Sequence, residues 1–206
     1  MIRSLKDILH NVSQISLKGP SNQNVSKIEV DSRKIQKDFL FVALSGLKSD
    51  GHDVRLFVLT SQAGQLELKQ YCDSLGLSDD AVIVGPVPHE QVGPFYDLID
   101  IFVVSRPDTR VTRLVTPLKP FEAMAMGRTV VASKLEALEE IIQHDKTGLL
   151  YKPDDLKDLS DTIEFCVNRP EKREELGHAA RQWVLGNRTW DVVVKNTEEV
   201  YNRLDT

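Results

Sequence analysis

Two kinds of apolar pattern alternate along most of the chain. Four continuous apolar runs predict buried strands, at residues 54–60, 81–84, 101–105 and 129–133. Between the first two runs, Leu66, Leu68 and Tyr71 are spaced as on one face of a helix, which predicts a helix over residues 65–75. Strands that alternate with helices at this distance form parallel sheets with right-handed crossovers. The pattern therefore predicts an α/β fold in which ligands bind outside the carboxyl ends of the strands.

The two ends of the chain carry weaker patterns. The first part predicts strands at residues 28–30 and 39–44, followed by a loop over residues 45–53. The last part predicts surface helices, because apolar residues recur there at helical spacing, as in Leu156, Leu159 and Ile163. We therefore expect a small α/β N-terminal segment and a helical C-terminal tail. The pattern changes at Val54, and we divide the chain there into residues 1–53 and 54–206.

Composition and charge exclude several classes of protein. The sequence has 206 residues, a net charge of −5 and a pI near 5.6, which argues against a dedicated nucleic-acid binder. Cys72 and Cys166 lack metal or CxxC spacing and predict reduced thiols, which favours a cytoplasmic location. The five histidines show no metal-ligand spacing, so we expect no metal. No apolar run is long enough to span a bilayer, so membrane association is expected to be peripheral if it occurs.

The segment from Val115 to Ser133 carries the clearest candidate chemistry. Thr116 is a good N-cap and Pro117 a natural first helical residue, so a helix is predicted to begin there. Lys119 in the first turn of a helix favours binding of an anion, above all phosphate. Gly127 suits the end of the helix. The alternative is an ordinary helix start, in which Glu122 only complements the helix dipole.

This segment resembles the donor-site signature of retaining glycosyltransferases of the GT-B type, which have two Rossmann-like halves. The signature reads E-x7-E and runs into P-L-E-A-M-A-x-G-x-P-V-V-A-S; here Glu122 matches its second Glu. The resemblance implies that Glu122 binds the ribose hydroxyls of the donor, and that Thr116, Leu118 and Lys119 lie at its diphosphate. The first Glu of the signature falls on Leu114, so the sugar-contacting carboxylate is missing at that position.

Other stretches resemble the same family in the same order along residues 54–202. Gly85-Pro86-Val87-Pro88-His89-Glu90-Gln91-Val92 resembles a loop whose backbone contacts the nucleotide base, which implies Val87 and His89 as site residues. Thr147-Gly148-Leu149-Leu150 resembles a second family motif. The resemblance implies a Rossmann-like donor domain over residues 54–206. It also implies that the substrate is a nucleotide-diphosphate sugar of the UDP type. Neither a cofactor nor a metal is expected.

The first part of the chain resembles a different family, the N-terminal UDP-binding domain of Mur ligases of peptidoglycan synthesis. The resemblance rests on four short stretches: Val30-Asp31-Ser32-Arg33-Lys34, Leu40-Phe41-Val42-Ala43, Gly46 and Asp50-Gly51-His52-Asp53. It implies that residues 1–53 are a fragment of such a domain, and that Ser32, Gly46 and Leu47 contact UDP. The G-K-[ST] phosphate loop of a ligase is absent from the sequence.

Three interpretations remain open at this stage. The chain is a glycosyltransferase represented mainly by its donor half, a UDP-binding module without turnover, or a join of two enzyme fragments by recombination, design or a gene-model error. We expect nucleotide binding without appreciable sugar transfer by this chain alone. Its partners are then a nucleotide sugar and either a completing chain or a second copy of itself.

Overall fold

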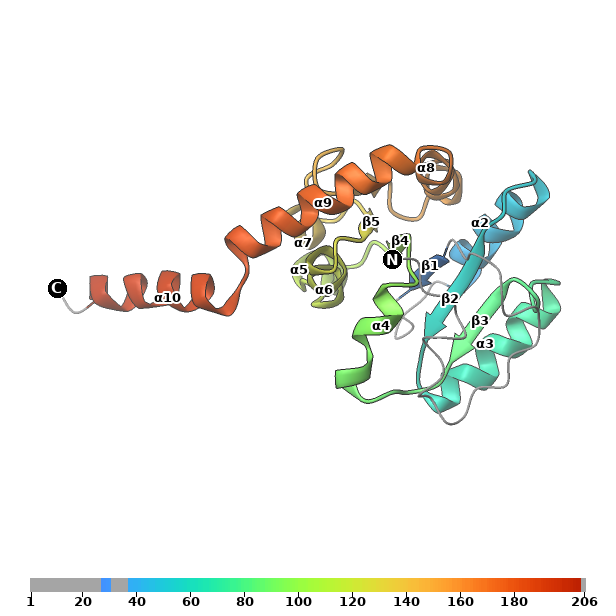
Figure 1. The fold of residues 1–206 in the computed structure, drawn as a ribbon, viewed down its shortest axis with the longest axis horizontal. Helices are drawn as coiled ribbons and strands as arrows, with labels where there is room; N and C mark the ends of the chain where they lie inside the picture. The colour runs from blue at the N-terminus through green and yellow to red at the C-terminus, as the bar shows by residue number, and fades with distance from the viewer. Residues whose placement is uncertain (1–26, 31–36, 205–206) are drawn as a thin grey trace.

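One six-stranded parallel sheet forms the centre of the protein (Figure 1). The computed structural model describes residues 27–30 and 37–204. The strand order is β3-β2-β1-β4-β5-β6, and every neighbouring pair is parallel. The strands are β1 (Lys27–Val30), β2 (Arg55–Leu59), β3 (Ala81–Val84), β4 (Ile101–Val104), β5 (Thr129–Ser133) and β6 (Leu149–Tyr151). The predicted α/β fold with a parallel, Rossmann-like sheet is confirmed.

Strand β1 lies between the two halves of this sheet. Ile28 pairs with Leu56 of β2 on one side and with Ile101 of β4 on the other. The chain therefore adds β2 and β3 in one direction and β4, β5 and β6 in the other, so the strand order reverses at β1. The strand predicted at residues 28–30 is confirmed, and it shares one sheet with the strands that follow Val54.

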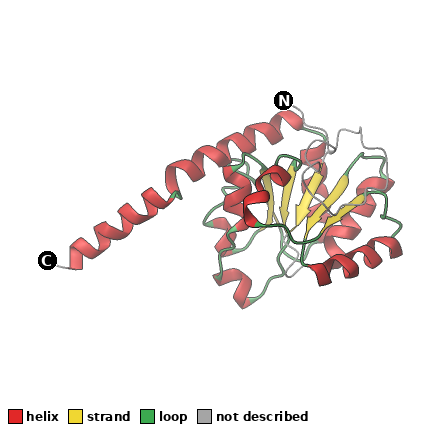
Figure 2. Ribbon diagram, turned by 60° about the horizontal axis from the view of Figure 1, so that its bottom comes forward, coloured by secondary structure: helices red, strands yellow, loops and turns green. Residues whose placement is uncertain are grey.

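Helices cover both faces of the sheet, which makes three layers (Figure 2). Successive strand residues face opposite layers: Leu56 and Val58 pack in one apolar cluster, and Phe57 between them packs in the other. Residues of α2, α3 and α8 line the first cluster, and residues of α4, α6 and α7 line the second; α9 contributes Leu176 to the first and Ala180 and Val184 to the second. Burial on both faces explains why the strands read as continuous apolar runs in the sequence.

Ten helical segments accompany the strands among the described residues. They are α2 (Lys37–Ser49), α3 (Gln62–Ser74), the 3-10 turn η2 (His89–Gln91), α4 (Gly93–Tyr96), α5 (Arg110–Leu114), α6 (Lys119–Ala125), α7 (Glu136–Glu139), α8 (Leu156–Val167), α9 (Pro170–Asn187) and α10 (Trp190–Leu204). The predicted helical C-terminal tail is confirmed. Its last helix, α10, projects away from the body of the protein (Figures 1 and 2).

The predicted strand at residues 39–44 is wrong, because this stretch lies inside helix α2. Leu40, Leu44 and Leu47 are buried at helical spacing. The apolar run is as long as a strand, and a run of that length does not by itself distinguish a strand from one face of a buried helix. The loop predicted over residues 45–53 is wrong in its first half, since α2 continues to Ser49.

A second local correction concerns the start of α3, which the sequence predicted at residue 65 and which lies at Gln62. Ser61 is the N-cap of α3, and its hydroxyl accepts a hydrogen bond from the Gly64 amide at 3.2 Å. Ser, Gly and Gln are typical of both turns and first helical turns, which is why the pattern placed the helix start too late.

Helices α6 and α9 meet at two glycines. Gly127, which follows α6, has a φ of +70°, a left-handed conformation that favours glycine. Its amide donates to Met124 and the next amide, of Arg128, donates to Ala123, which closes the helix end. Gly177 of α9 lies against this turn, and a Cβ atom on Gly177 would collide with the Gly127 carbonyl oxygen. The backbone approach therefore needs glycine at position 177.

We expect Gly177→Ala to destabilise the protein by about 1–3 kcal/mol, because the added methyl group must push α9 away from the α6 turn. Gly186→Ala is the matched control on the same helix, since nothing lies within 4 Å of a Cβ atom there. The control should be neutral or more stable by up to about 1 kcal/mol, because alanine is the better helix former. Chemical denaturation followed by circular dichroism measures both values. Equal effects of the two substitutions would contradict the close approach.

The two cysteines are free and buried in the same apolar cluster. Burial raises the pKa of the Cys72 thiol to about 11 and that of the Cys166 thiol to about 12. An unfolded thiol has a pKa of about 8.5. Above that pH the unfolded chain loses protons that the folded chain keeps, so the thiols favour unfolding as the pH rises.

We expect the free energy of unfolding to be unaffected by these thiols below about pH 8 and to fall by on the order of 1 kcal/mol per thiol between pH 8 and 10. Denaturation curves measured across this range test the slope. A Cys72→Ala/Cys166→Ala variant should lose it, whatever its absolute stability. A slope that persists in the variant would show that other groups cause it.

Candidate functional site

The candidate site lies at the carboxyl edge of the sheet, where the connections after β4 and β5 begin. Residues 105–118 leave β4 and lead through α5 to α6. Residues 134 and 135 leave β5 and lead to α7. In a doubly wound sheet, the crevice for a ligand opens at this edge, beside the point where the strand order reverses. That point lies between β1 and β4 here.

Glu122 is held in place by a tyrosine that the sequence did not single out. The hydroxyl of Tyr96, at the end of α4, donates a hydrogen bond to Oε2 of Glu122 at 2.8 Å. Tyr96 is buried and Glu122 is half-buried on α6. A carboxylate has about four acceptor positions, so this bond orients Glu122 and leaves capacity for further donors. Tyr96 could have been noticed because its phenol would need a partner once buried.

Helix α6 begins later than the sequence predicted. Leu118, not Thr116, is its N-cap, and no side chain caps it. The amides of Phe121 and Glu122 donate to the Leu118 carbonyl, so the first turn closes there. The guanidinium of Arg106 donates to the Val115 carbonyl at 2.6 Å and holds the preceding segment outside the helix. The Thr116 N-cap prediction is therefore wrong, although Thr116 and Lys119 still lie half-buried near the edge.

Short helix α5 is fixed by its own side chains. Thr109 and Thr112 form a reciprocal capping box, in which each side chain accepts from the other's amide. The Arg113 guanidinium donates two hydrogen bonds to Asp108, at 2.5 and 2.7 Å. Hydrogen bonding to Arg113 lowers the pKa of Asp108 and raises the pKa of Arg113. The guanidinium groups of Arg106 and Arg113 are thus engaged with the protein itself.

Buried hydroxyl groups form a chain under the carboxyl ends of three strands. The Arg106 amide donates to Ser133, the Ser133 hydroxyl donates to Tyr151 at 3.0 Å, and the Tyr151 hydroxyl donates to Ser105 at 2.8 Å. Burial raises the pKa of Tyr151, and the hydrogen bonds with Ser105 and Ser133 oppose that rise. The neutral tyrosine therefore locks the ends of β4, β5 and β6 together directly below the candidate site.

The other predicted site residues fall at separate places. Val87 is half-buried and His89 is exposed, in the connection that follows β3. Leu47 is 1% exposed within the core, and Gly46 lies on the solvent face of α2. Because α2 runs back along the sheet after β1, both lie near the amino edge, so the structure does not bring them to Glu122. Ser32 lies outside the described residues.

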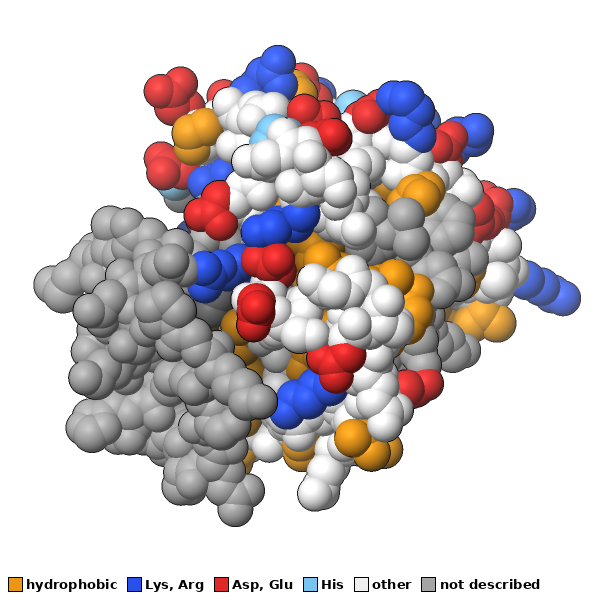
Figure 3. Space-filling model, turned by 90° about the vertical axis from the view of Figure 1, so that its right-hand side faces the viewer, with side chains coloured by type: hydrophobic (Ala, Val, Ile, Leu, Met, Phe, Trp, Pro, Cys, Tyr) orange, Lys and Arg blue, Asp and Glu red, His pale blue; other side chains and the backbone are white. Residues whose placement is uncertain are grey.

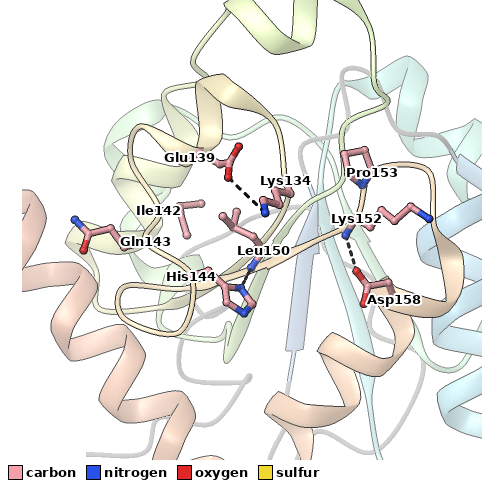
Figure 4. Close-up of a pocket in the computed structure, with 9 residues that line it drawn as sticks. All are labelled: Lys134, Glu139, Ile142, Gln143, His144, Leu150, Lys152, Pro153 and Asp158. Carbon is pink, nitrogen blue, oxygen red and sulfur yellow. Dashed lines mark hydrogen bonds and ion pairs between the residues drawn. The ribbon is translucent and has the colours of Figure 1, made fainter.

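A pocket of about 620 Å³ lies beside edge strand β6 (Figure 4). The Leu150 amide donates to Nδ1 of His144 at 3.0 Å, and the Lys152 amide donates to Asp158 at 2.6 Å. The Lys134 ammonium lies 3.9 Å from Glu139, and Figure 4 shows the Lys152 side chain directed away from the pocket. The pocket contains none of the predicted site residues.

Two wider properties bear on ligands and partners. Within residues 27–30 and 37–204, no cluster of three or more histidine, cysteine, aspartate or glutamate side chains could hold a metal ion. Over the same ranges, no helix has both the length and the apolar character needed to cross a bilayer. On the face that Figure 3 shows, basic and acidic side chains are interspersed, so neither sign dominates there.

Comparison with known proteins gives a consistent family match. Residues 29–183 match the family model described as "Glycosyl transferases group 1". An uncharacterized glycosyltransferase of Methanocaldococcus jannaschii is 27% identical over 155 residues, which are 73% of this chain and 37% of that protein. The structure of Anabaena HepE in complex with UDP and glucose aligns with a TM-score of 0.69 and 20% identity, over 89% of this chain and 49% of that one.

The resemblance to Mur ligases has weaker support. The UDP-N-acetylmuramoyl-L-alanyl-D-glutamate–2,6-diaminopimelate ligase of Cytophaga hutchinsonii is 32% identical over 101 residues, which are 45% of this chain and 20% of the ligase. The family match above begins at residue 29 and crosses the predicted boundary at 53/54. The chain spans less than half the length of each of these relatives.

We expect Tyr151→Phe to destabilise the protein by about 1–3 kcal/mol, because the buried hydroxyls of Ser105 and Ser133 then lose a partner. Tyr201→Phe is the matched control, since Tyr201 is 66% exposed on α10. Denaturant midpoints measured by circular dichroism compare the two. If Tyr151→Phe is as stable as the control, the hydroxyl chain does not hold the strand ends.

Proposed function

The chain belongs to the glycosyl transferases group 1 family, and on that premise we propose that it binds a nucleotide-diphosphate sugar, with UDP as the nucleotide. The observation that carries the proposal is the carboxylate of Glu122, which Tyr96 orients at 2.8 Å on helix α6. Ribose presents two neighbouring hydroxyl donors, and a fixed carboxylate is an acceptor suited to both. Glu122 is thus proposed to bind the ribose.

The remaining contacts follow from the places of the predicted residues. Leu118 is 75% exposed and Lys119 half-buried, so this turn is open to a diphosphate after β4. Lys119 and Thr116 supply a cation and a hydroxyl for its oxygens. Val87 and His89 follow β3, and we propose that their backbone contacts the base. The HepE complex supports UDP only as the ligand of a protein with the same fold.

Binding and transfer place different demands on the protein. Transfer also needs a surface that holds the acceptor, and the chain spans less than half the length of its relatives. We therefore propose that this unit binds the donor, and that transfer also requires an acceptor-binding unit. The buried free thiols support a reducing, cytoplasmic setting.

The partial ligase match favours a second candidate, a UDP-binding module without turnover. That candidate is distinguished by its ligand, because it should bind UDP-N-acetylmuramoyl peptides more tightly than UDP-hexoses. A link to cell-wall precursor synthesis would follow from that result alone. Titration calorimetry with both ligand classes separates the two candidates.

We expect Glu122→Ala to weaken UDP binding ten- to a hundredfold, since charge-assisted hydrogen bonds contribute about 1.5–3 kcal/mol. Glu122→Gln should show a smaller loss, because the amide still accepts from Tyr96 and from one ribose hydroxyl. Calorimetric titration of UDP and of GDP into each variant gives the affinities and the choice of base.

Glu140→Ala is the control for these titrations, since Glu140 is exposed at the end of α7. Its UDP affinity should equal that of the wild type. Circular dichroism shows whether each variant is folded, which matters for Glu122→Ala because it removes the partner of the Tyr96 hydroxyl. Equal UDP affinity of wild type and both Glu122 variants would refute the ribose site.

A further inference from the structure

A second pocket, of about 480 Å³, opens between α5 and α7. Its walls are Arg110, Arg113 and Leu114 on α5 and Glu136 on α7. Helix α5 follows β4 and helix α7 follows β5, so the pocket lies over the carboxyl ends of two neighbouring strands. It therefore borders the same edge at which the nucleotide is proposed to bind.

The α5 wall of this pocket has a fixed shape. The capping box of Thr109 and Thr112 closes the start of α5, and the Arg106 guanidinium holds the Val115 carbonyl just beyond its end. The paired hydrogen bonds to Asp108 fix the Arg113 guanidinium. A ligand that enters the pocket therefore meets groups that are already oriented, which reduces the entropy lost on binding.

The chemical character of the walls is mixed. Glu136 is exposed on the first turn of α7, and its charge reaches Arg113, where it adds to the effect of Asp108. Arg110 supplies donors only and Glu136 acceptors only. Leu114 is 72% exposed and adds an apolar side chain next to them. A carboxylate, a guanidinium and an apolar face together suit a ring that has hydroxyl groups on its rim and C–H groups on its faces.

We propose that Glu136 binds hydroxyl groups of the donor's hexose in this pocket, with Leu114 packing against the sugar ring. This proposal rests on the proposed function, because the sugar reaches the pocket only when the nucleotide is bound at the neighbouring edge. The sequence has no acid at position 114, and the pocket receives its carboxylate from the opposite wall, on the connection after the next strand. Glu136 is therefore a specificity-determining residue for the sugar.

A simpler role for Glu136 exists. An acid in the first turn of a helix complements the helix dipole, and this would make Glu136 a stabilising residue without a ligand. The two roles differ in what they affect. A dipole role changes stability and leaves all affinities alone, whereas a sugar contact changes the affinity for the nucleotide sugar and leaves that for the free nucleotide alone.

The test is calorimetric titration of UDP, UDP-glucose and UDP-N-acetylglucosamine into the wild type, Glu136→Gln and Glu140→Gln. Glu140→Gln removes an exposed acid from the end of the same short helix, outside the pocket. For the UDP-sugar that the wild type binds more tightly, we expect Glu136→Gln to weaken affinity about tenfold, as for one lost charge-assisted hydrogen bond. The affinity for UDP should stay within twofold, and Glu140→Gln should match the wild type throughout.

The outcomes separate this inference from the proposed function. If Glu136→Gln changes neither affinity, or lowers those for UDP and UDP-sugar equally, the inference is overturned and the proposed nucleotide site stands. If the wild type binds none of the three ligands, both are overturned. A selective loss for the UDP-sugar, with circular dichroism unchanged, supports the assignment of Glu136.

Discussion

The double pairing of strand β1 is the constraint on which the rest of the protein depends. Parallel strands have no hairpin to hold them together, so each relies on its neighbours and on helices that cover both faces. β1 is four residues long, and it supplies the inner partner for both β2 and β4. The reversal of strand order at β1 also decides where connections diverge, and hence where a crevice opens. The two acids discussed above come from connections on the β4 side of that reversal.

Much of the sheet could be predicted from the sequence because most of its strands are marked by a continuous run of apolar residues. The runs at residues 81–84 and 129–133 are short and are bounded by polar or glycine-containing turns, so their pattern has one interpretation. The run at residues 39–44 had two, and only packing of Leu40, Leu44 and Leu47 in a common cluster decides for a helix. The same error put Gly46 and Leu47 in a loop, whereas both lie towards the end of helix α2.

Glu122 could be found in the sequence because its neighbours form a motif, but its pairing with Tyr96 could not, although a buried phenol needs some partner. The hydrogen bond from Tyr96 joins residues 26 positions apart, and no local sequence pattern predicts that pairing. The hydroxyl chain through Tyr151 likewise joins three strand ends. A residue such as Glu136 is harder still to identify as a site residue from the sequence, because an acid in the first turn of a helix is already explained by the helix dipole. A ligand-binding role for such a residue can be inferred only when the structure shows which residues face it across a pocket.

The placement of the aromatic side chains has a consequence for spectroscopy. The sequence contains two tryptophans. Trp183 lies half-buried on α9 with the Arg188 guanidinium 5.5 Å from its ring centre, and Trp190 is 83% exposed at the start of α10. An isolated helix shorter than about 12–15 residues is marginal in water, and α10, with 15 residues, projects from the body. Intrinsic fluorescence therefore combines two signals: Trp183 packs against the apolar cluster on one face of the sheet, whereas Trp190 reports on the junction of the last two helices. Unfolding followed by tryptophan emission and by far-ultraviolet dichroism is then not required to show one common midpoint. A difference between the two midpoints would measure how independently α10 unfolds.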